Sequence, residues 1–401
     1  MKMYKPSQKI LDKYADVLVN FALHSGKGIK RGDVVFLQVP ECAKPMLLSL
    51  RRAVLKAGAH PIIEYLPDEI SREYYELANE EHLNFFPEHY ARGKVKQADH
   101  FIMIIAETDK KELEGIHPGK MMTKQKSWKP YSDWRDKKEN EGKLTWTLGL
   151  YGTEAMAKEA GLTLKEYWGE IIKACYLNDK SPIGRWKAAI KEVERVRKRL
   201  DALKIEKLYV KSKDTDLIVK LGAGRKWLGG SGRNIPSFEV FISPDWRGTS
   251  GKVYFNRPLY RYGNLIREVY LEFEEGVVVK SSAKKGEKVL REMIDSKNAD
   301  KIGEFSLTDS RLSKITKFMA ETLFDENVGG KNGNMHLALG KAYQDSYIGN
   351  PRKVSKKKWE DMGYNDSVVH TDIVSTENRV VTAELRNGKK IVIYRDGKFT
   401  I

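Results

Sequence analysis

The chain has 401 residues, of which 41% are hydrophobic and 32% are charged; this is enough to bury sizeable cores and favours two or more domains. Its net charge of +17 comes from basic residues spread among acidic ones, without an RNA-binding aromatic motif or a zinc finger, so nucleic acid is not expected as the main ligand. The longest apolar runs, such as residues 101–106, are far too short to cross a bilayer.

The sequence starts with MKMYKPSQK, which lacks the apolar stretch of a secretory signal. Its two cysteines, Cys42 and Cys175, lie far apart and indicate neither a disulfide framework nor a C-x-x-C metal motif. We therefore expect a reduced, cytoplasmic protein without a membrane segment.

The first half alternates predicted helices with predicted strands. Helices are expected at 10–22, 44–57 and 71–79, and strands at 32–39, 60–65, 100–106 and 144–149. This alternation favours a parallel sheet with right-handed crossovers. The first strand–helix turn lacks G-x-G-x-x-G, so the sequence gives no support for a dinucleotide site.

The middle of the chain contains one polar stretch and two well-marked helix starts. Residues 128–142 are rich in Trp, Lys and Asp and are expected to be a surface excursion. Thr163 and Glu166 form a capping box before a helix that runs to Cys175. Ser181-Pro182 begins a long charged helix that ends at about residue 203, and we place the domain boundary near residue 200.

The second half changes to short β segments. Strands are expected at 207–211, 217–221, 239–243, 252–255, 266–273 and 277–281, with hairpin turns at 274–276, 387–388 and 396–397. The fold class is therefore α/β, with an N-terminal parallel-sheet α/β domain (residues 1–200) and a C-terminal mixed α+β domain (residues 201–401).

Residues 323–343 and 367–372 carry the side chains most typical of a metal site. His336 and Tyr343 are seven positions apart, so they share a face if a helix begins at His336. His370 and Asp372 are two positions apart, which places both on one face of a strand. We expect these four side chains to converge from a helix and a strand.

Two glutamates at the starts of predicted strands, Glu239 and Glu304, complete the candidate set. Singly, such residues are usually a solvated charge, a packed histidine or a core tyrosine. Together, oxygen and nitrogen donors without a thiolate fit a catalytic Zn, Co or Mn better than a structural zinc. More than four candidate ligands suggest two ions that share a bridging group, which would make residues 201–401 the catalytic, metal-binding domain.

The segments NIPSFEVF, IGEF, LFDEN, HLALGKAY and VVHTD follow one another in the second half, and GDVVFLQ, AVLKAGAHP and AMAKEAG in the first. In this order they make the chain resemble the thermophilic-aminopeptidase family of metallopeptidases over nearly its whole length. The resemblance implies a dinuclear metallo-exopeptidase that removes N-terminal residues from peptides with a free N-terminus, uses two divalent ions (Co, Zn or Mn) and forms a homodimer. By motif match, its metal ligands would be Glu239, Glu304, His336, Tyr343, His370 and Asp372.

Three departures from the family pattern concern the substrate more than the metals. Phe238 stands where the family usually has a second acidic residue, residues 328–335 form a longer loop than in several members, and Ile373-Val374 replace a usual Phe-Met. They leave the preferred N-terminal residue open.

Peptide hydrolysis by a metal-activated water, the mechanism that we expect, also needs a carboxylate that carries a proton to the leaving amine. Glu304 and Glu326 are both candidates, the latter because of its place in the FDEN segment. Tyr343 could be a ligand or could hydrogen-bond the oxyanion. Two other functions stay open: a non-catalytic binding protein on the same scaffold, which the intact ligand set argues against, and a metallohydrolase for another amide, which would accept N-blocked substrates.

Overall fold

The structure is a computed structural model that describes residues 4–401. The chain divides into two compact units. The N-terminal unit contains the residues up to Ile190 together with Ser231–Ser237 and Lys317–Phe324, and the C-terminal unit contains Lys191–Gly230, Phe238–Thr316 and Asp325–Ile401. Among the described residues, no helix combines the length and the apolar character that a membrane crossing requires.

The N-terminal half of the chain alternates helices and strands, as predicted. In chain order its elements are α1 (Gln8–Val17), the π-helical η1 (Leu18–Ala22), β1 (Val34–Pro40), η2 (Glu41–Ala43), α2 (Lys44–Lys56), β2 (His60–Leu66), α3 (Ser71–Leu77), α4 (Glu80–Asn84), α5 (Glu88–Gln97), β3 (His100–Ile105), α6 (Pro118–Ser127), α7 (Lys129–Asn140), β4 (Thr145–Leu150), α8 (Glu154–Glu159), α9 (Leu164–Ala174) and α10 (Pro182–Ala202).

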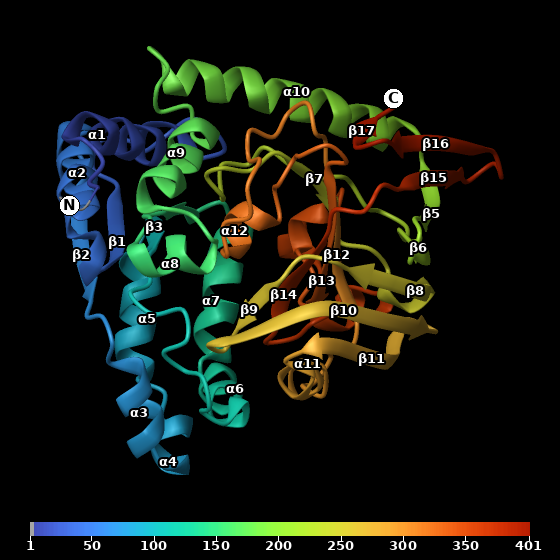
Figure 1. Cartoon of the computed structure of the whole chain (residues 1–401), viewed down its shortest axis with the longest axis horizontal. Helices are drawn as coiled ribbons and strands as arrows, with labels where there is room; N and C mark the ends of the chain where they lie inside the picture. Colours follow the sequence, from blue (N-terminus) through green and yellow to red (C-terminus); the bar gives the residue numbers. More distant parts are fainter. Residues whose placement is uncertain (1–3) are drawn as a thin grey trace. The chain divides into compact units, whose positions relative to one another are not determined.

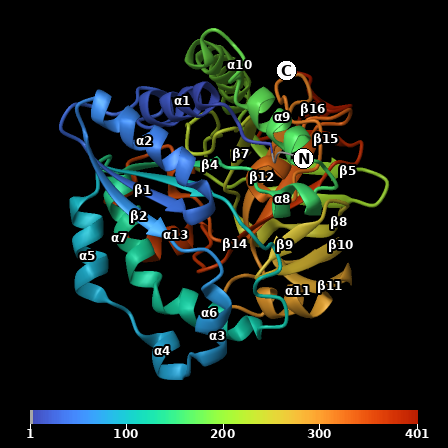
Figure 2. The ribbon, with the colours of Figure 1, turned by 60° about the vertical axis from the view of Figure 1, so that its left-hand side comes forward.

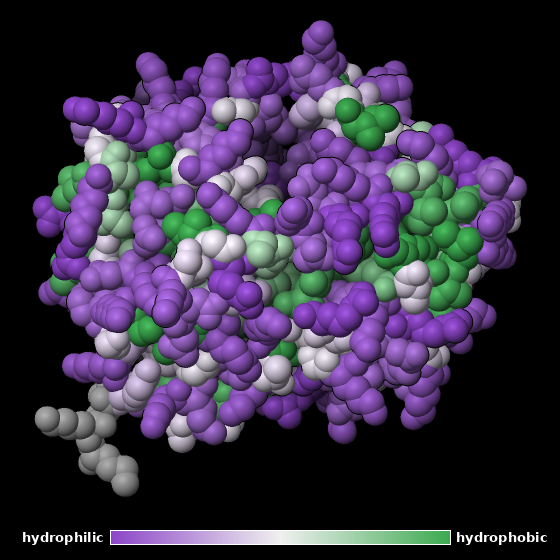
Figure 3. All heavy atoms as spheres, turned by 90° about the horizontal axis from the view of Figure 1, so that it is seen from above, coloured by the Kyte–Doolittle hydropathy of each residue, from purple (hydrophilic) through white to green (hydrophobic). Residues whose placement is uncertain are grey.

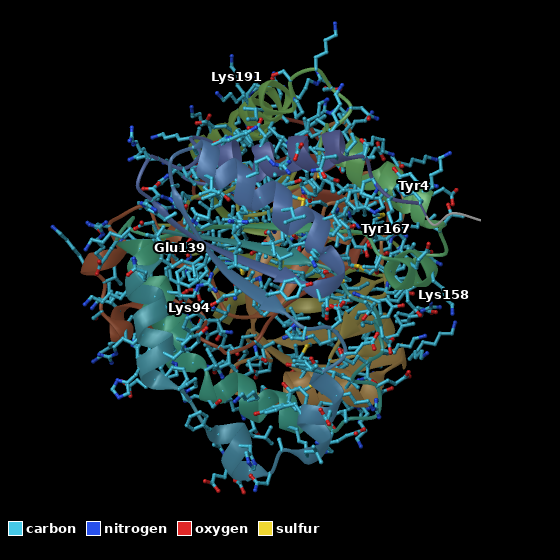
Figure 4. All side chains as sticks on the ribbon, turned by 90° about the vertical axis from the view of Figure 1, so that its left-hand side faces the viewer. Tyr4, Lys94, Glu139, Lys158, Tyr167 and Lys191 are labelled. Atoms are coloured by element: carbon cyan, nitrogen blue, oxygen red, sulfur yellow. The ribbon has the colours of Figure 1, made fainter. Side chains whose placement is uncertain are left out.

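The four strands of this unit form one parallel sheet in the order β2-β1-β3-β4, which confirms the predicted sheet. Helices cover both of its faces: α1 and α2 lie on one, and α5 and α7 on the other (Figures 1 and 2). Lys94 on α5, labelled in Figure 4, places its ammonium 5.5 Å from the ring centre of Phe101 on β3 and pairs with Glu64 on β2.

The helix cap at Thr163 and the segment 128–142 were both predicted from the sequence. The capping box is confirmed, because Thr163 accepts a hydrogen bond from the backbone N–H of Glu166 and the Glu166 carboxylate accepts one from the N–H of Thr163. The predicted polar excursion at 128–142 is instead largely helix α7. Its cationic side chains attach this helix to β3 and α5. Arg135 lies over the ring of Phe101 on β3, and Lys138 donates to three backbone carbonyls at the end of α5.

The C-terminal half is rich in strands. Its elements are β5 (Ile205–Lys211), β6 (Asp216–Lys220), β7 (Glu239–Ile242), η3 (Trp246–Gly248), β8 (Ser250–Phe255), β9 (Leu259–Arg261), β10 (Asn264–Glu274), β11 (Val277–Lys285), α11 (Glu287–Ile294), β12 (Ile302–Thr308), α12 (Thr322–Asp325), β13 (Asn334–Gly340), η4 (Gln344–Ser346), η5 (Pro351–Lys353), α13 (Lys356–Asp361), β14 (His370–Ser375), β15 (Val380–Leu385), β16 (Lys390–Arg395) and β17 (Lys398–Phe399).

These strands form two antiparallel sheets that share one hydrophobic core. The larger sheet has the order β11-β10-β8-β6-β5-β15-β16-β17, with β9 paired to β10, and the smaller has the order β14-β13-β12-β7. Side chains from both sheets and from α10 and α11 meet in this core. Hydrophilic residues cover most of the face shown in Figure 3, and hydrophobic ones form separate groups on it.

The helix predicted to begin at His336 is wrong, because residues 334–340 form the inner strand β13. Met335, Leu337 and Leu339 point into the core, while His336 and Ala338 alternate with them. Glycines bound the segment, and both Gly333 and Gly340 have a positive φ. Leu and Ala favour helices intrinsically, but seven residues buried on both faces of a sheet fit a strand.

Candidate metal centre

The smaller sheet of the C-terminal unit has one face that packs into the core and one that carries the predicted site. Because side chains alternate along a strand, residues paired across strands point the same way. His336 pairs with Ser306, Glu304 and Asp372 both pair with Ala338, His370 pairs with Gly340, and Glu239 pairs with Thr308. The register therefore places Glu239, Glu304, His336, His370 and Asp372 on the same face, opposite the core.

The distances show how closely these groups converge. His336 Nε2 lies 3.1 Å from Glu304 Oε1, 3.2 Å from Glu239 Oε2 and 3.8 Å from Asp372 Oδ1. His370 Nε2 lies 3.6 Å from Asp372 Oδ1 and 3.9 Å from Glu304 Oε2. The two oxygens of Glu304 thus face two different histidines, so this one carboxylate could contribute an oxygen beside each imidazole.

Both histidines are oriented by backbone carbonyls. Nδ1 of His336 lies 3.2 Å from the carbonyl oxygen of Glu326, and Nδ1 of His370 lies 2.8 Å from that of Lys341. Because a carbonyl only accepts, Nδ1 carries the proton in each ring, and a neutral ring then offers the lone pair of Nε2 to the cluster. This is the usual way in which proteins orient a metal-binding imidazole.

Burial and charge shift the pKa values of the cluster in opposite directions. Burial alone lowers the pKa of His336, but the bond to Glu304 and the charges of Glu239 and Asp372 outweigh it and raise the pKa to about 10. Burial likewise disfavours the charged form of His370, yet Asp372 raises its pKa to about 9. Burial and the neighbouring acids raise the pKa of Glu239 to about 7, against the influence of His336.

Glu326, the second candidate for proton transfer, belongs to the same cluster. It is buried, and desolvation together with the charges of Asp372 and Glu239 raises the pKa of its carboxyl well above the usual value. Asn327 Nδ2 donates to Glu326 Oε1 at 3.3 Å, and Asn327 Oδ1 accepts the N–H of Phe238 at 2.7 Å. Asn327 therefore connects Glu326 to the residue before Glu239.

Tyr343 lies beside the cluster, but not for the reason that the sequence suggested. It follows β13 and precedes η4, and its N–H donates to Ser243 Oγ at 2.8 Å. Its ring centre lies 4.9 Å from that of His370 and 6.0 Å from that of Phe241. The structure thus brings its ring next to one candidate ligand from the segment that follows β13, and not through a shared helix face.

Ser306 and Asn327 were missed by sequence reasoning. Ser306 Oγ donates to Glu239 Oε2 at 3.1 Å and orients that carboxylate. It stands two positions after Glu304, so strand alternation could have placed it on the same face. Asn327 carried no such signal, because its partner Phe238 is 89 positions away in the chain.

The spacing of the donors fits a metal. Ligand atoms of Glu239, Glu304 and His336 all lie within 4.8 Å of one another, and all three residues are buried. Donors that share one ion at about 2.0–2.2 Å are themselves roughly 3–4 Å apart. Carboxylates gathered this closely away from water need a cation or protons to balance their charge.

Comparison with known proteins agrees with this geometry. The sequence pattern of the family described as thermophilic metalloprotease (M29) matches residues 7–399. The chain belongs to this family. It is 28% identical to Aminopeptidase T of Thermus thermophilus over 96% of its own length and 98% of that protein, and 28% identical to Aminopeptidase AmpS of Bacillus subtilis over 98% of each.

A solved structure, titled wild-type AmpT from Thermus thermophilus, shares the fold of this M29 chain. It superposes with a TM-score of 0.83 at 26% sequence identity and covers 98% of this chain and 100% of that one. Membership of a metalloprotease family implies that the chain uses a divalent metal, and the buried cluster of Glu239, Glu304 and His336 is a candidate site for it.

Proposed function

We propose that this chain releases the N-terminal residue of peptides with a free α-amine, at a pair of divalent ions held by residues of the small sheet. The chain is a metallo-aminopeptidase of the M29 family, as its family match and the full-length relatives named aminopeptidases support. The observation that carries the dinuclear arrangement is Glu304, whose two oxygens face His336 and His370 separately. The proposed ligands are Glu239, Glu304, His336, Tyr343, His370 and Asp372.

When bound, the ions would polarise the scissile carbonyl and lower the pKa of the attacking water toward neutrality. The chain supplies the proton transfer. Asn327 Nδ2 donates to Oε1 of Glu326, so a proton on that carboxyl sits on Oε2, from which it can move to the leaving amine. Glu304 is the alternative carrier, although its position between the two histidines favours a ligand role. Tyr343, beside His370, is placed to ligate or to donate a hydrogen bond to the oxyanion.

The remaining features of the assignment rest on the family resemblance and on a few observations. We assign catalysis to residues 201–401, which contain every proposed ligand, and we propose that the chain acts as a homodimer on peptide substrates. Cys42 and Cys175 are both free thiols, which supports a reducing compartment such as the cytoplasm.

The test is hydrolysis of an aminoacyl-p-nitroanilide series by EDTA-treated protein, with Co²⁺, Zn²⁺ or Mn²⁺ restored singly. We expect activity to vanish on chelation, to return with metal, and to occur only on unblocked amines. The matched control is the same series with N-acetylated substrates. Cleavage of the acetylated series would instead support a metallohydrolase for another amide.

Metal analysis of the same samples distinguishes an aminopeptidase from a non-catalytic binding protein. Two ions bound at the cluster with no hydrolysis of any substrate would favour a binding protein on this scaffold. A stoichiometry of one ion at the cluster would contradict the bridging role of Glu304.

A further inference from the structure

The N-terminal unit contains a second cluster of metal-ligating side chains, made of His24, Asp33 and His100. A ring nitrogen of each histidine and a carboxylate oxygen of Asp33 all lie within 4.8 Å of one another. We infer that this cluster binds one divalent transition ion of the zinc class, separate from the proposed catalytic pair. Every donor belongs to the N-terminal unit, whereas the proposed catalytic ligands belong to the C-terminal unit.

The cluster lies where three neighbouring parallel strands begin. Asp33 immediately precedes β1, His100 is the first residue of β3, and Thr145 is the first residue of β4. Because the sheet order is β2-β1-β3-β4, these three positions are adjacent at the end of the sheet where its parallel strands begin. His24 reaches the same edge from the turn that follows η1, and its ring meets that of His100 edge to face with centres 4.6 Å apart.

The local backbone fixes the ring of His24. His24 has a φ of 50°, a left-handed conformation that side-chain-bearing residues seldom adopt. Its Nδ1 lies 2.9 Å from the carbonyl oxygen of Gly28, so Nδ1 is the donor and Nε2 keeps its lone pair. Only glycine fits at position 28 of this turn, because a Cβ there would lie 2.5 Å from the backbone of Asn20.

A side chain orients the ring of His100. It is 1% exposed, and its Nδ1 lies 2.8 Å from Thr145 Oγ1, which also accepts the backbone N–H of His24 at 3.3 Å. Thr145 thus positions both histidines, as the outer partner of a metal-binding imidazole commonly does. His100 Nε2 faces Asp33 Oδ2 at 2.9 Å.

The spacing and chemistry of the three donors select the kind of ion. Two ligand atoms on a tetrahedral zinc at about 2.0–2.1 Å are roughly 3.3 Å apart, so His100 and Asp33 need to separate by only a few tenths of an ångström. Two imidazoles and one carboxylate suit zinc and its neighbours, whereas Ca²⁺ and Mg²⁺ prefer oxygen donors. Asp33 and His24 are half-buried, which leaves an approach for the ion and for a water as fourth ligand.

The experiment uses full-length protein without a histidine tag, in a background that carries His336→Ala and Asp372→Ala so that the proposed catalytic centre is disabled. Zn²⁺ is titrated into the metal-free protein against a chromophoric chelator. We expect one zinc to bind. Adding His24→Gln should weaken this binding by at least about 100-fold, and adding Thr145→Val by roughly 10–100-fold, the usual effect of losing an outer partner.

The matched control is His89→Gln on α5, an exposed histidine, which should leave the affinity unchanged. Far-UV circular dichroism of each variant checks the fold, and Asp33→Asn provides a second, partly exposed ligand change. No zinc bound in the disabled background, or binding that survives both His24→Gln and Asp33→Asn, would overturn the inference. The readout does not depend on peptide hydrolysis, so a failure of the proposed function would not be mistaken for a failure of this site.

Discussion

The two histidine–carboxylate clusters of this chain differ in how many acids surround each buried imidazole. His336 and His100 are equally buried, at 1% exposure each. Three carboxylates lie within 3.8 Å of His336 Nε2, whereas Asp33 is the one carboxylate within hydrogen-bonding distance of His100 among the described residues. The pKa of His336 accordingly rises to about 10, while burial prevails at His100 and lowers its pKa despite the bond to Asp33.

This difference shows that burial alone does not set the charge of a histidine. In the acid-rich cluster of Glu239, Glu304, His336 and Asp372 the carboxylates favour a positive charge beside them, which protons supply in the metal-free protein and which the proposed divalent ions would supply instead. In the N-terminal cluster the environment holds His100 neutral, and one ion suffices. The acid-rich cluster is therefore suited to the two ions that we propose for it, while the N-terminal cluster is suited to the single ion that we infer there.

Removing ligands should produce the largest contrast between the clusters. We expect His336→Ala or Asp372→Ala to reduce kcat/KM by at least about 10⁴-fold, or about 5.4 kcal/mol, because the metal chemistry is lost. His24→Gln should leave kcat/KM within about twofold, since His24 lies in the other unit. The measurement is hydrolysis of an aminoacyl-p-nitroanilide at saturating Co²⁺ or Zn²⁺. An active His336→Ala/Asp372→Ala double variant would reject the catalytic assignment.

Two conservative substitutions should show which of Glu304 and Glu326 is a metal ligand and which carries the proton. Glu326→Gln keeps the shape of the side chain and removes its titration, so we expect kcat to fall by roughly 10²-fold or more with both ions still bound. Glu304→Gln should lower the metal content as well, because its oxygens face both histidines. Elemental analysis beside kinetics distinguishes the two. Loss of metal in Glu326→Gln and not in Glu304→Gln would exchange their roles.

The pH dependence of metal binding should differ between the clusters. His336 and His370, with pKa values raised to about 10 and about 9, are protonated at pH 7 in the metal-free protein and must release protons to bind an ion. Affinity at this centre should therefore increase with pH between 7 and 9, by up to about tenfold per unit for each proton released. The lowered pKa of His100 predicts no such release from that ring. Calorimetry in buffers of different ionisation enthalpy counts the protons.

The same shifts predict how the metal-free fold responds to pH. A histidine whose pKa is higher in the folded state stabilises that state most below its unfolded pKa of about 6.5, and this contribution is lost as the pH rises through the folded value. The raised pKa of Glu239 acts in the same direction at lower pH, because its contribution is lost as the pH rises from the unfolded value through about 7. Urea unfolding of the metal-free protein should thus show lower stability at pH 9.5 than at pH 7. An unchanged or higher stability would contradict the raised pKa values.

The sequence allowed the fold class and most strands and helices to be predicted, because period, caps and glycine turns are local signals. It also predicted correctly that His370 and Asp372 share a strand face, which lies on β14. The helix predicted for His336 and Tyr343 was wrong. The short apolar segment Leu337–Leu339 is compatible with the period of a helix and with that of a strand, and it is burial on both faces of the sheet that favours the strand. The pairing of His24 with His100 was not foreseen, since it depends on a left-handed turn and on strand order.

The smallest effect should come from a side chain that orients the acid-rich cluster without belonging to the proposed ligands. Asn327→Ala removes the bonds to Phe238 N–H and to Glu326, so it leaves a buried donor unpaired, at a cost of about 1–3 kcal/mol of folding stability. We expect kcat to fall several-fold with metal content retained, since Glu326 loses its orientation but not its carboxyl. Asn378→Ala, at an exposed position, is the control and should change neither quantity. If Asn327→Ala lost stability while kcat stayed constant, Asn327 would serve the fold alone, and the proton-transfer role of Glu326 would not depend on it.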